Sequence, residues 1–284
     1  MSAVDQDGFS SWRYRLVRRF GDWLATDVQP RGAPRTDFER LCEHLRPGDV
    51  VLVEGRTRAS GVIQSVTLSS WSHAALYIGR ISELEHEGAR QRSELGGWPR
   101  ETPMLVEAEM GRGVCLSTLA RYRGEHLRIC RPRDLAETDR AAVIAYACER
   151  LGTPYDMRQI ADLLRFFLPY GILPRRWRST LFEAGHGDNI RAICSTLLAN
   201  AFASVRYPIL PTIHRGGNGE MVFHRRNGRL ITPRDFDHSP YFDIIKFPFF
   251  GDDVARYHEL DWDEDAPRAS RPAAHRAGRA RGAS

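Results

Sequence analysis

Residues 45–53 have the sequence Leu-Arg-Pro-Gly-Asp-Val-Val-Leu-Val, and residues 72–79 have the sequence Ser-His-Ala-Ala-Leu-Tyr-Ile-Gly. In each stretch a polar turn leads into a short apolar run, which is typical of a strand that starts at the surface and enters a core. The first stretch predicts a turn at residues 46–49 and a strand at Val50–Val53. The second predicts a strand at Ser72–Ile78.

Further strands and helices follow from the same patterns. Three more strands are expected at Met104–Ala108, Val114–Ser117 and His126–Cys130. One helix, capped by Asp134 or Thr138, is expected to run to about Leu151, and helices are also expected at Asp156–Leu168 and Ile193–Val205. Because a cluster of strands precedes a cluster of helices, the fold class is predicted to be α+β, with an antiparallel sheet of about five strands packed on helices.

Two segments have no strong periodicity. Ser82–Pro103 is polar and contains glycine, so we expect an exposed insertion between two strands. Tyr207–Phe250 is rich in proline and glycine, with short apolar runs at Leu230–Thr232 and Phe242–Phe247, and we expect an irregular return of the chain.

Composition excludes several classes of protein. The chain has 284 residues, of which 42% are hydrophobic and 27% charged, which is ordinary for a globular protein. It has five cysteines with no Cys-x-x-Cys pair, which argues against a disulfide framework and a structural zinc site, so we expect no metal and no cofactor. The sequence shows neither a secretory signal at its start nor an apolar stretch long enough to cross a membrane, so we expect a cytoplasmic protein.

The two ends of the sequence differ from its middle. Residues 1–34 are predicted to form an amphipathic helix, Ser11–Thr26, and a linker. Its Trp/Leu face and its arginines are typical of helices that lie on a membrane surface, but packing on the domain is the more common reason for such a pattern. Residues 35–250 are predicted to form the main domain, and residues 264–284 a disordered Arg-rich tail. Membrane contact through residues 11–26 would give a peripheral position on the inner membrane surface.

The charge does not favour nucleic acid as a partner. The net charge is +5, and five arginines fall in the last 17 residues. Without that tail the chain is close to neutral, so a nucleic-acid role is not expected.

A histidine and a glutamate interrupt two of the predicted strands. His73 opens an otherwise apolar strand, and Glu107 lies between apolar residues of the next one. A carboxylate in that position needs a partner. If the two strands are neighbours, Glu107 can hydrogen-bond the imidazole of His73 and fix its tautomer. The alternative for a lone strand histidine is a structural role.

Cys194 lies near the start of a strongly predicted helix, in Ile193-Cys-Ser-Thr-Leu-Leu198. A thiol in the first helical turn is exposed to the positive end of the helix dipole, which favours the thiolate. The alternative is a buried helix cysteine. Together, Cys194, His73 and Glu107 would form a Cys/His/acid arrangement for nucleophilic catalysis.

These segments, in this order, resemble the circularly permuted NlpC/P60 superfamily, papain-like cysteine hydrolases of the YiiX/YebB/YaeF type. The resemblance rests on residues 45–53 and 72–79, on Val106-Glu-Ala108 with Gly113-Val114, and on three later segments. Those are Gly152-Thr-Pro-Tyr-Asp156, the segment 193–198, and Thr232-Pro-Arg-Asp-Phe236 with Ser239-Pro-Tyr-Phe-Asp243. It covers about residues 45–248 and implies a permuted papain-like fold.

The resemblance implies roles for four residues. Cys194 would be the nucleophile, His73 the general base, Glu107 the third, polar residue, and Tyr155 would line the substrate site near the thiol, unless it is a core aromatic. The function implied is hydrolysis of an amide bond, as in a peptidoglycan-type peptide, through an acyl-enzyme. The alternatives are a lipid acyltransferase or thioesterase at the membrane surface, which would take a lipid acyl substrate instead of a peptide, and a non-catalytic binding module.

Overall fold

The computed structural model describes residues 26–27, 36–109, 112–154, 193–215, 217, 220–224 and 226–247. They all fall in the first of two units of the chain, Met1–Phe249, and the second unit, Phe250–Ser284, lies outside the described residues. The predicted helices at residues 11–26 and 156–168 and the Arg-rich tail also lie outside them, apart from Thr26.

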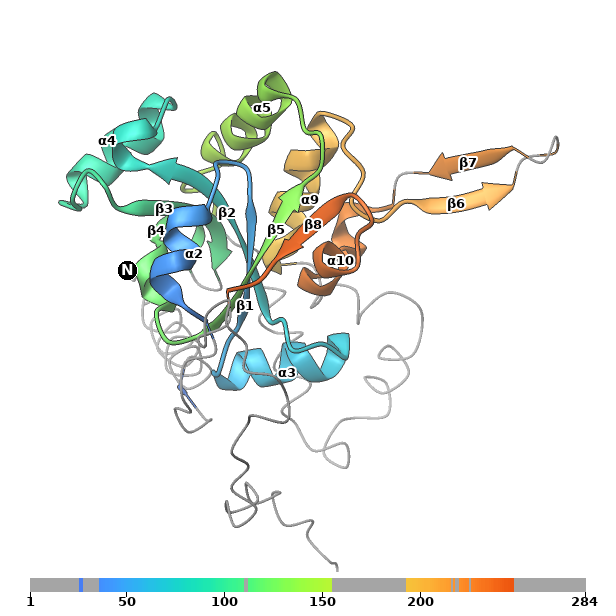
Figure 1. Cartoon of the computed structure of the whole chain (residues 1–284), viewed down its shortest axis with the longest axis horizontal. Helices are drawn as coiled ribbons and strands as arrows, with labels where there is room; N and C mark the ends of the chain where they lie inside the picture. Colours follow the sequence, from blue (N-terminus) through green and yellow to red (C-terminus); the bar gives the residue numbers. More distant parts are fainter. Residues whose placement is uncertain are drawn as a thin grey trace, which may run out of the picture. The chain divides into compact units, whose positions relative to one another are not determined.

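A six-stranded antiparallel sheet forms the centre of this unit, with the strand order β4-β3-β2-β1-β5-β8 (Figure 1). Its strands are β1 (Val50–Glu54), β2 (His73–Arg80), β3 (Pro103–Glu109), β4 (Gly113–Thr118), β5 (His126–Pro132) and β8 (Phe242–Ile245). The five strands that the sequence predicts are all present, each within two residues of its expected ends. The predicted α+β class is confirmed, and β8 adds a sixth strand to the sheet.

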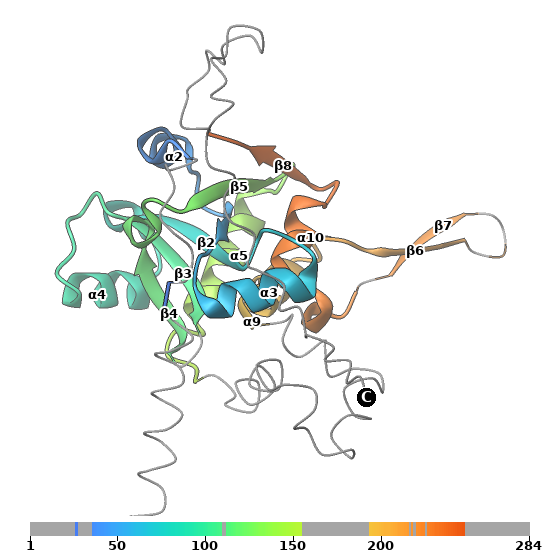
Figure 2. The same cartoon turned by 90° about the horizontal axis from the view of Figure 1, so that it is seen from below.

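Helices cover both faces of the sheet (Figure 2). They are α2 (Phe38–His44), α3 (Arg58–Thr67), α4 (Glu87–Leu95), α5 (Glu137–Cys148), α9 (Ile193–Ser204) and α10 (Pro233–Asp237), with 3-10 turns η1 (Ile81–Glu83), η2 (Leu119–Tyr122) and η3 (Gly228–Leu230). Helix α2 packs on one face through Phe38 and Leu41, whereas α5 and α9 belong to the core on the other face. Each face therefore has a hydrophobic core of its own.

Strand β2 shows how alternation builds these two cores. Ala74, Leu76 and Ile78 are buried in the core that contains α5 and α9. Ala75 and Tyr77 are buried in the core that contains α2. The sequence predicts this alternation, because successive strand residues point to opposite faces.

The turn before β1 is held by a buried carboxylate. Gly48 has φ +92°, a conformation that favours glycine. Asp49 is 1% exposed and accepts a hydrogen bond from the Arg46 backbone N–H at 2.8 Å. The Arg131 guanidinium of β5 donates to both Asp49 oxygens, at 2.9 and 2.8 Å. The polar turn in the sequence is thus fixed to the neighbouring strand.

Several predictions about helices and loops are wrong. Helix α5 is preceded by Ala136 at its N-cap, without a side-chain cap, so neither Asp134 nor Thr138 caps it. The segment 82–103 is a mostly exposed insertion between β2 and β3, as predicted, but it contains a helix that the sequence does not indicate, α4, which buries Ala89 and Ser93. Two small side chains give too weak an apolar stripe to predict a helix.

The expected irregular return is also more ordered than predicted. It contains α10 and β8, and a two-stranded hairpin of β6 (Thr212–Arg215) and β7 (Met221–His224), which projects from the sheet (Figure 1). The sequence does not indicate helices α2 and α3, because segments of 7 and 10 residues give periodic patterns that are too short to recognise. Within the described part of the chain, no helix is long and apolar enough to span a bilayer.

Candidate active site

The expected pair of His73 and Glu107 is present. Strands β2 and β3 are antiparallel neighbours, so the first residue of β2 and a central residue of β3 come together. The His73 Nε2 atom lies 2.5 Å from Glu107 Oε2. The Glu107 side chain is fully buried, whereas 19% of the His73 side chain is exposed. The pair therefore joins a buried carboxylate to an imidazole that solvent or a ligand can reach.

Two residues of η2, missed in the sequence, complete the surroundings of Glu107. The Tyr122 hydroxyl donates a hydrogen bond to Glu107 Oε2 at 2.5 Å. Arg121 Nη1 lies 3.8 Å from Glu107 Oε1, an atom with no hydrogen-bond partner among the described residues. No motif marks Arg121 or Tyr122 in the sequence, because they reach Glu107 from a turn and not from a paired strand.

These partners keep Glu107 ionised. Burial alone would raise the pKa of its carboxyl group, but the hydrogen bond and charge of His73, together with the hydroxyl of Tyr122, lower the pKa from 4.5 to about 2. A carboxylate that is charged at neutral pH can stabilise an imidazolium on His73. The electrostatics of the pair thus suit a histidine that accepts and releases a proton.

Cys194 is the second residue of α9 and lies in its first turn, but its side chain lies outside the described part of the structure. The predicted helix Ile193–Val205 is confirmed, since α9 ends at Ser204. The meeting of the Cys194 thiol with His73 stays a prediction. So does the role of Tyr155, which lies outside the described residues.

The direction of α9 can be followed through its neighbours. Beyond its C-terminus, the Tyr207 hydroxyl donates to the carbonyls of Arg133 and Tyr241, which lie just past the end of β5 and just before β8. Strands β5 and β2 run in the same direction, because both are antiparallel to β1. The C-terminus of α9 is therefore at the edge of the sheet where β2 ends, and its N-terminus points to the edge where β2 begins with His73.

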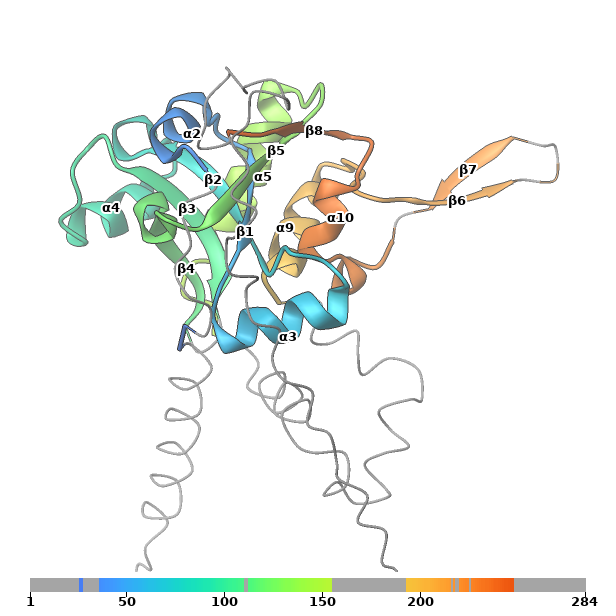
Figure 3. The ribbon, with the colours of Figure 1, turned by 60° about the horizontal axis from the view of Figure 1, so that its bottom comes forward.

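A hydrogen bond at the other end of α9 agrees with this direction. The Ser195 hydroxyl donates to the Ile231 carbonyl at 2.5 Å, directly before α10. Helix α10 in turn supplies Asp237, which accepts a hydrogen bond from the Trp71 indole at 3.1 Å, two residues before His73. Figure 3 shows α3 crossing this same end of the sheet, between the end of β1 and the start of β2. We call this end the His73 edge.

The two faces of β2 constrain how a thiol could reach the imidazole. Helix α9 packs on the face of Ala74 and Leu76, and alternation places His73 on the opposite face, with Ala75. Because His73 is the first residue of β2, a side chain at the start of α9 has a route past the end of the strand. The sheet itself does not have to be crossed.

The other four cysteines are free thiols of low reactivity. Burial raises the pKa of Cys42 to about 11 and that of Cys148 to about 12. It also raises the pKa of Cys115 and of Cys130. These thiols stay protonated at neutral pH, so they provide an internal reference for the reactivity of Cys194.

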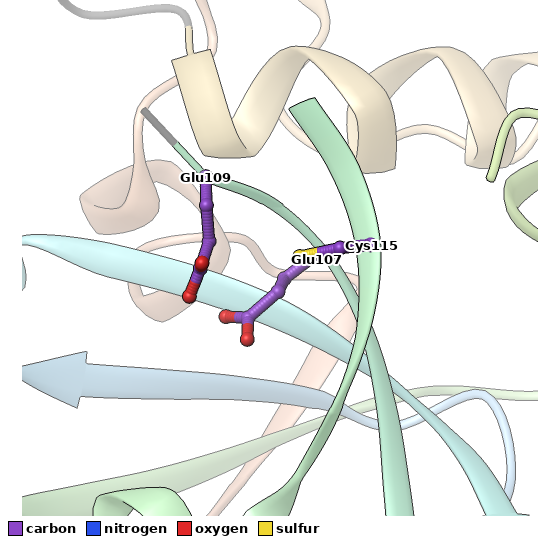
Figure 4. Close-up of side chains that lie close together, drawn as sticks. All are labelled: Glu107, Glu109 and Cys115. Carbon is purple, nitrogen blue, oxygen red and sulfur yellow. The ribbon is translucent and has the colours of Figure 1, made fainter. Parts of the chain in front are cut away.

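Glu107, Glu109 and Cys115 form a cluster of possible metal ligands, with one ligand atom of each within 4.8 Å of the others (Figure 4). The two glutamates come from β3 and the cysteine from β4. Arg112 and Arg121 both pair with Glu109, and Glu107 is engaged by His73. Because these groups already neutralise the carboxylates and the Cys115 pKa is raised, the cluster is better explained as an ion-pair network than as a metal site.

Residues 44–163 match the model of a family described as permuted papain-like amidase enzyme, YaeF/YiiX, C92 family. The matched segment includes His73 and Glu107 and ends before Cys194. The match confirms the resemblance to permuted papain-like enzymes of the YaeF/YiiX type, and with it the predicted class of enzyme, a cysteine hydrolase. The match does not identify the substrate or the catalytic residues.

Among solved structures, the chain is similar to the crystal structure of the metalloprotein YiiX from Escherichia coli O157:H7. The two share 15% sequence identity over 71% of this chain and 97% of that chain, with a TM-score of 0.41. No curated protein matches the chain.

Proposed function

We propose that the protein hydrolyses an amide bond of a peptide-type substrate, with the Cys194 thiolate as nucleophile and His73 as general base and acid. Glu107 positions the imidazole. The observation that carries this proposal is the pair of His73 and the buried Glu107, at the edge of the sheet toward which the N-terminus of α9 points.

The chemistry follows from the geometry of the pair. With Nε2 of His73 on the Glu107 carboxylate, Nδ1 is the nitrogen that takes the proton of the thiol. The thiolate attacks the carbonyl carbon, and the imidazolium then gives its proton to the leaving amine as the C–N bond breaks. Water, deprotonated by His73, hydrolyses the thioester and releases a carboxylic acid and the thiol. Backbone N–H groups in the first turn of α9 would hold the oxyanion.

We take a peptidoglycan-type peptide as the substrate class, since the family match is to amidases. Lipid acyl transfer depended on the amphipathic segment 11–26, which lies outside the described residues except for Thr26, and no described feature favours it. The non-catalytic alternative makes a distinct prediction about thiol reactivity.

The test compares two cysteine variants. Cys194→Ala should abolish hydrolysis of a muropeptide, measured by release of a new amine. The matched control Cys42→Ala should retain the wild-type rate, because Cys42 is a partly exposed thiol whose pKa is raised to about 11. Full activity of Cys194→Ala would overturn the proposal.

A second measurement separates an enzyme from a binding module. Iodoacetamide at pH 7 should alkylate Cys194 faster than the four other thiols, all of which have raised pKa values. Equal, slow alkylation of all five cysteines would favour the non-catalytic module.

A further inference from the structure

A polar cleft opens at the His73 edge, with a volume of about 410 Å³. That volume is in the range of small-ligand sites. Its wall is formed by the loop between α3 and β2, the end of β1, the start of β5, and α10. The residues that matter here are Glu54, Trp71, His126, Arg128, Arg234 and Asp237.

The floor of the cleft is a rigid set of contacts around Trp71, which is 3% exposed. The ring of His126 stacks on the indole with centroids 5.4 Å apart, and the Arg128 guanidinium lies 4.7 Å from the indole centroid. Asp237 accepts a hydrogen bond from the indole N–H at 3.1 Å and one from Arg128 at 2.5 Å. A floor with these internal bonds is formed before any ligand arrives, which lowers the entropic cost of binding.

Arg234 differs from Arg128 in its partners. The charge of Arg128 is matched by Asp237. Arg234 donates to the Thr67 carbonyl at 3.3 Å, and within the described residues no carboxylate pairs with it. A partly buried guanidinium at a cleft wall, without a carboxylate, is suited to bind an anion in a bidentate manner.

The cleft is close to the candidate active site. Val53 of β1 pairs with His73, and Glu54, the next residue, pairs with His126 in the cleft wall. Trp71 precedes His73 by two residues. By alternation, the side chains of Glu54 and His126 point to the sheet face that α9 covers. A ligand in the cleft would therefore approach the His73 edge from the side of the first turn of α9, and not from the face of the imidazole.

We infer that this cleft binds the free carboxylate of a peptide substrate through Arg234, so that the amide bond to be cleaved lies close to a carboxylate-bearing end of the peptide. The inference rests on the proposed function and adds the substrate class. Glu54 also lines the wall, and its negative charge opposes the binding of such an anion.

The experiment uses two peptide acrylamides with the same sequence, one ending in a free carboxylate and its twin in a carboxamide. Adducts on Cys194 of the full chain are quantified by mass spectrometry over a range of concentrations, which separates the half-saturating concentration from the maximal alkylation rate. For the wild type, the carboxylate twin should saturate at a roughly tenfold lower concentration, with an equal maximal rate.

Three variants make the test specific to the cleft. Arg234→Gln should remove the preference by weakening only the carboxylate twin. Glu54→Gln should increase the preference. Arg133→Gln is the control, since this arginine pairs with Asp243 beside the opposite edge and should keep the wild-type preference. An unchanged melting temperature of Arg234→Gln would show that the fold is intact.

The outcomes distinguish this inference from the proposed function. If Cys194 reacts with both twins equally in the wild type, or if Arg234→Gln keeps the preference, the cleft does not bind the carboxylate and the inference is wrong. If Cys194 reacts with neither twin, the proposed function itself fails and the inference with it.

Discussion

Two fully buried carboxylates lie in the same sheet, and their pKa values are shifted in opposite directions. Asp49, at the start of β1, is bound by the Arg131 guanidinium and the Arg46 backbone N–H. Glu107, in β3, is bound by the His73 imidazole and the Tyr122 hydroxyl. Burial raises the pKa of Asp49 and outweighs its hydrogen bonds, whereas the partners of Glu107 outweigh burial and lower its pKa to about 2.

The difference lies in what the partners can do. A guanidinium and a backbone amide keep their protons at every physiological pH, so Asp49 can only hold the turn against β5. An imidazole exchanges protons near neutrality, so Glu107 holds a group that can change its charge. Burial alone therefore does not identify a functional carboxylate in this sheet. The kind of partner separates the two carboxylates, since Glu107 pairs with an imidazole and Asp49 with a guanidinium.

The largest effect is expected for Glu107→Gln. The amide removes the charge that stabilises the imidazolium and disturbs the orientation of His73, so the rate of amide hydrolysis should fall by about 10³-fold. The control is Glu109→Gln, two residues along the same strand, whose carboxylate pairs with Arg112 and Arg121. Equal rates for Glu107→Gln and Glu109→Gln would contradict a specific role for Glu107.

For Asp49→Asn we expect the opposite result, a loss of stability without a loss of activity. It leaves the partly buried Arg131 without its carboxylate, and we expect the free energy of unfolding to fall by about 2 kcal/mol in urea denaturation at pH 7. The folded fraction should hydrolyse the substrate at the wild-type rate. A large loss of rate in folded Asp49→Asn would remove the distinction between the two carboxylates.

The stability of the protein should depend on pH through Glu107. Because folding lowers the pKa of Glu107 from 4.5 to about 2, its ionised form stabilises the native state above pH 4.5, and this stabilisation is lost as the pH falls from about 4.5 to 2. The difference in unfolding free energy between wild type and Glu107→Gln should shrink over that range. A difference of the same size at pH 5 and pH 2.5 would show that the pKa is not lowered.

The sequence predicts the parts of this molecule that depend on local periodicity. Short apolar runs between turns are enough to place the five strands. Alternation along β2 then assigns neighbours such as Ala74 and Ala75 to opposite faces. The contact between His73 and Glu107 could be predicted as well, since it requires only that two consecutive strands pair. Helix α9 was predicted to within one residue of its end.

The remainder depends on contacts between distant segments. Tyr122 approaches Glu107 from a 3-10 turn, where no spacing rule relates it to a strand position. The cleft combines segments from β1, β5, α10 and the loop before β2, and Arg128 and Asp237, which form its floor, are 109 residues apart. Helix α10 has only 5 residues, which is too short for a periodic pattern.

The smallest effect is expected for Tyr122→Phe, which removes one of the two hydrogen bonds on Glu107 Oε2 and leaves His73 in place. The free energy of unfolding should fall by about 1 kcal/mol. With one donor lost, the pKa of Glu107 rises, so the acid limb of the pH profile of Cys194 alkylation should move to higher pH.

Tyr207→Phe is the matched control for this variant. It also removes a hydroxyl that is hydrogen-bonded, here to the carbonyls of Arg133 and Tyr241, but at the opposite edge of the sheet. We expect a similar loss of stability without any shift of the alkylation profile. If Tyr122→Phe and Tyr207→Phe change the profile equally, Tyr122 contributes to the fold only. A shift confined to Tyr122→Phe would make it a positioning residue for Glu107, because general destabilisation affects both variants alike.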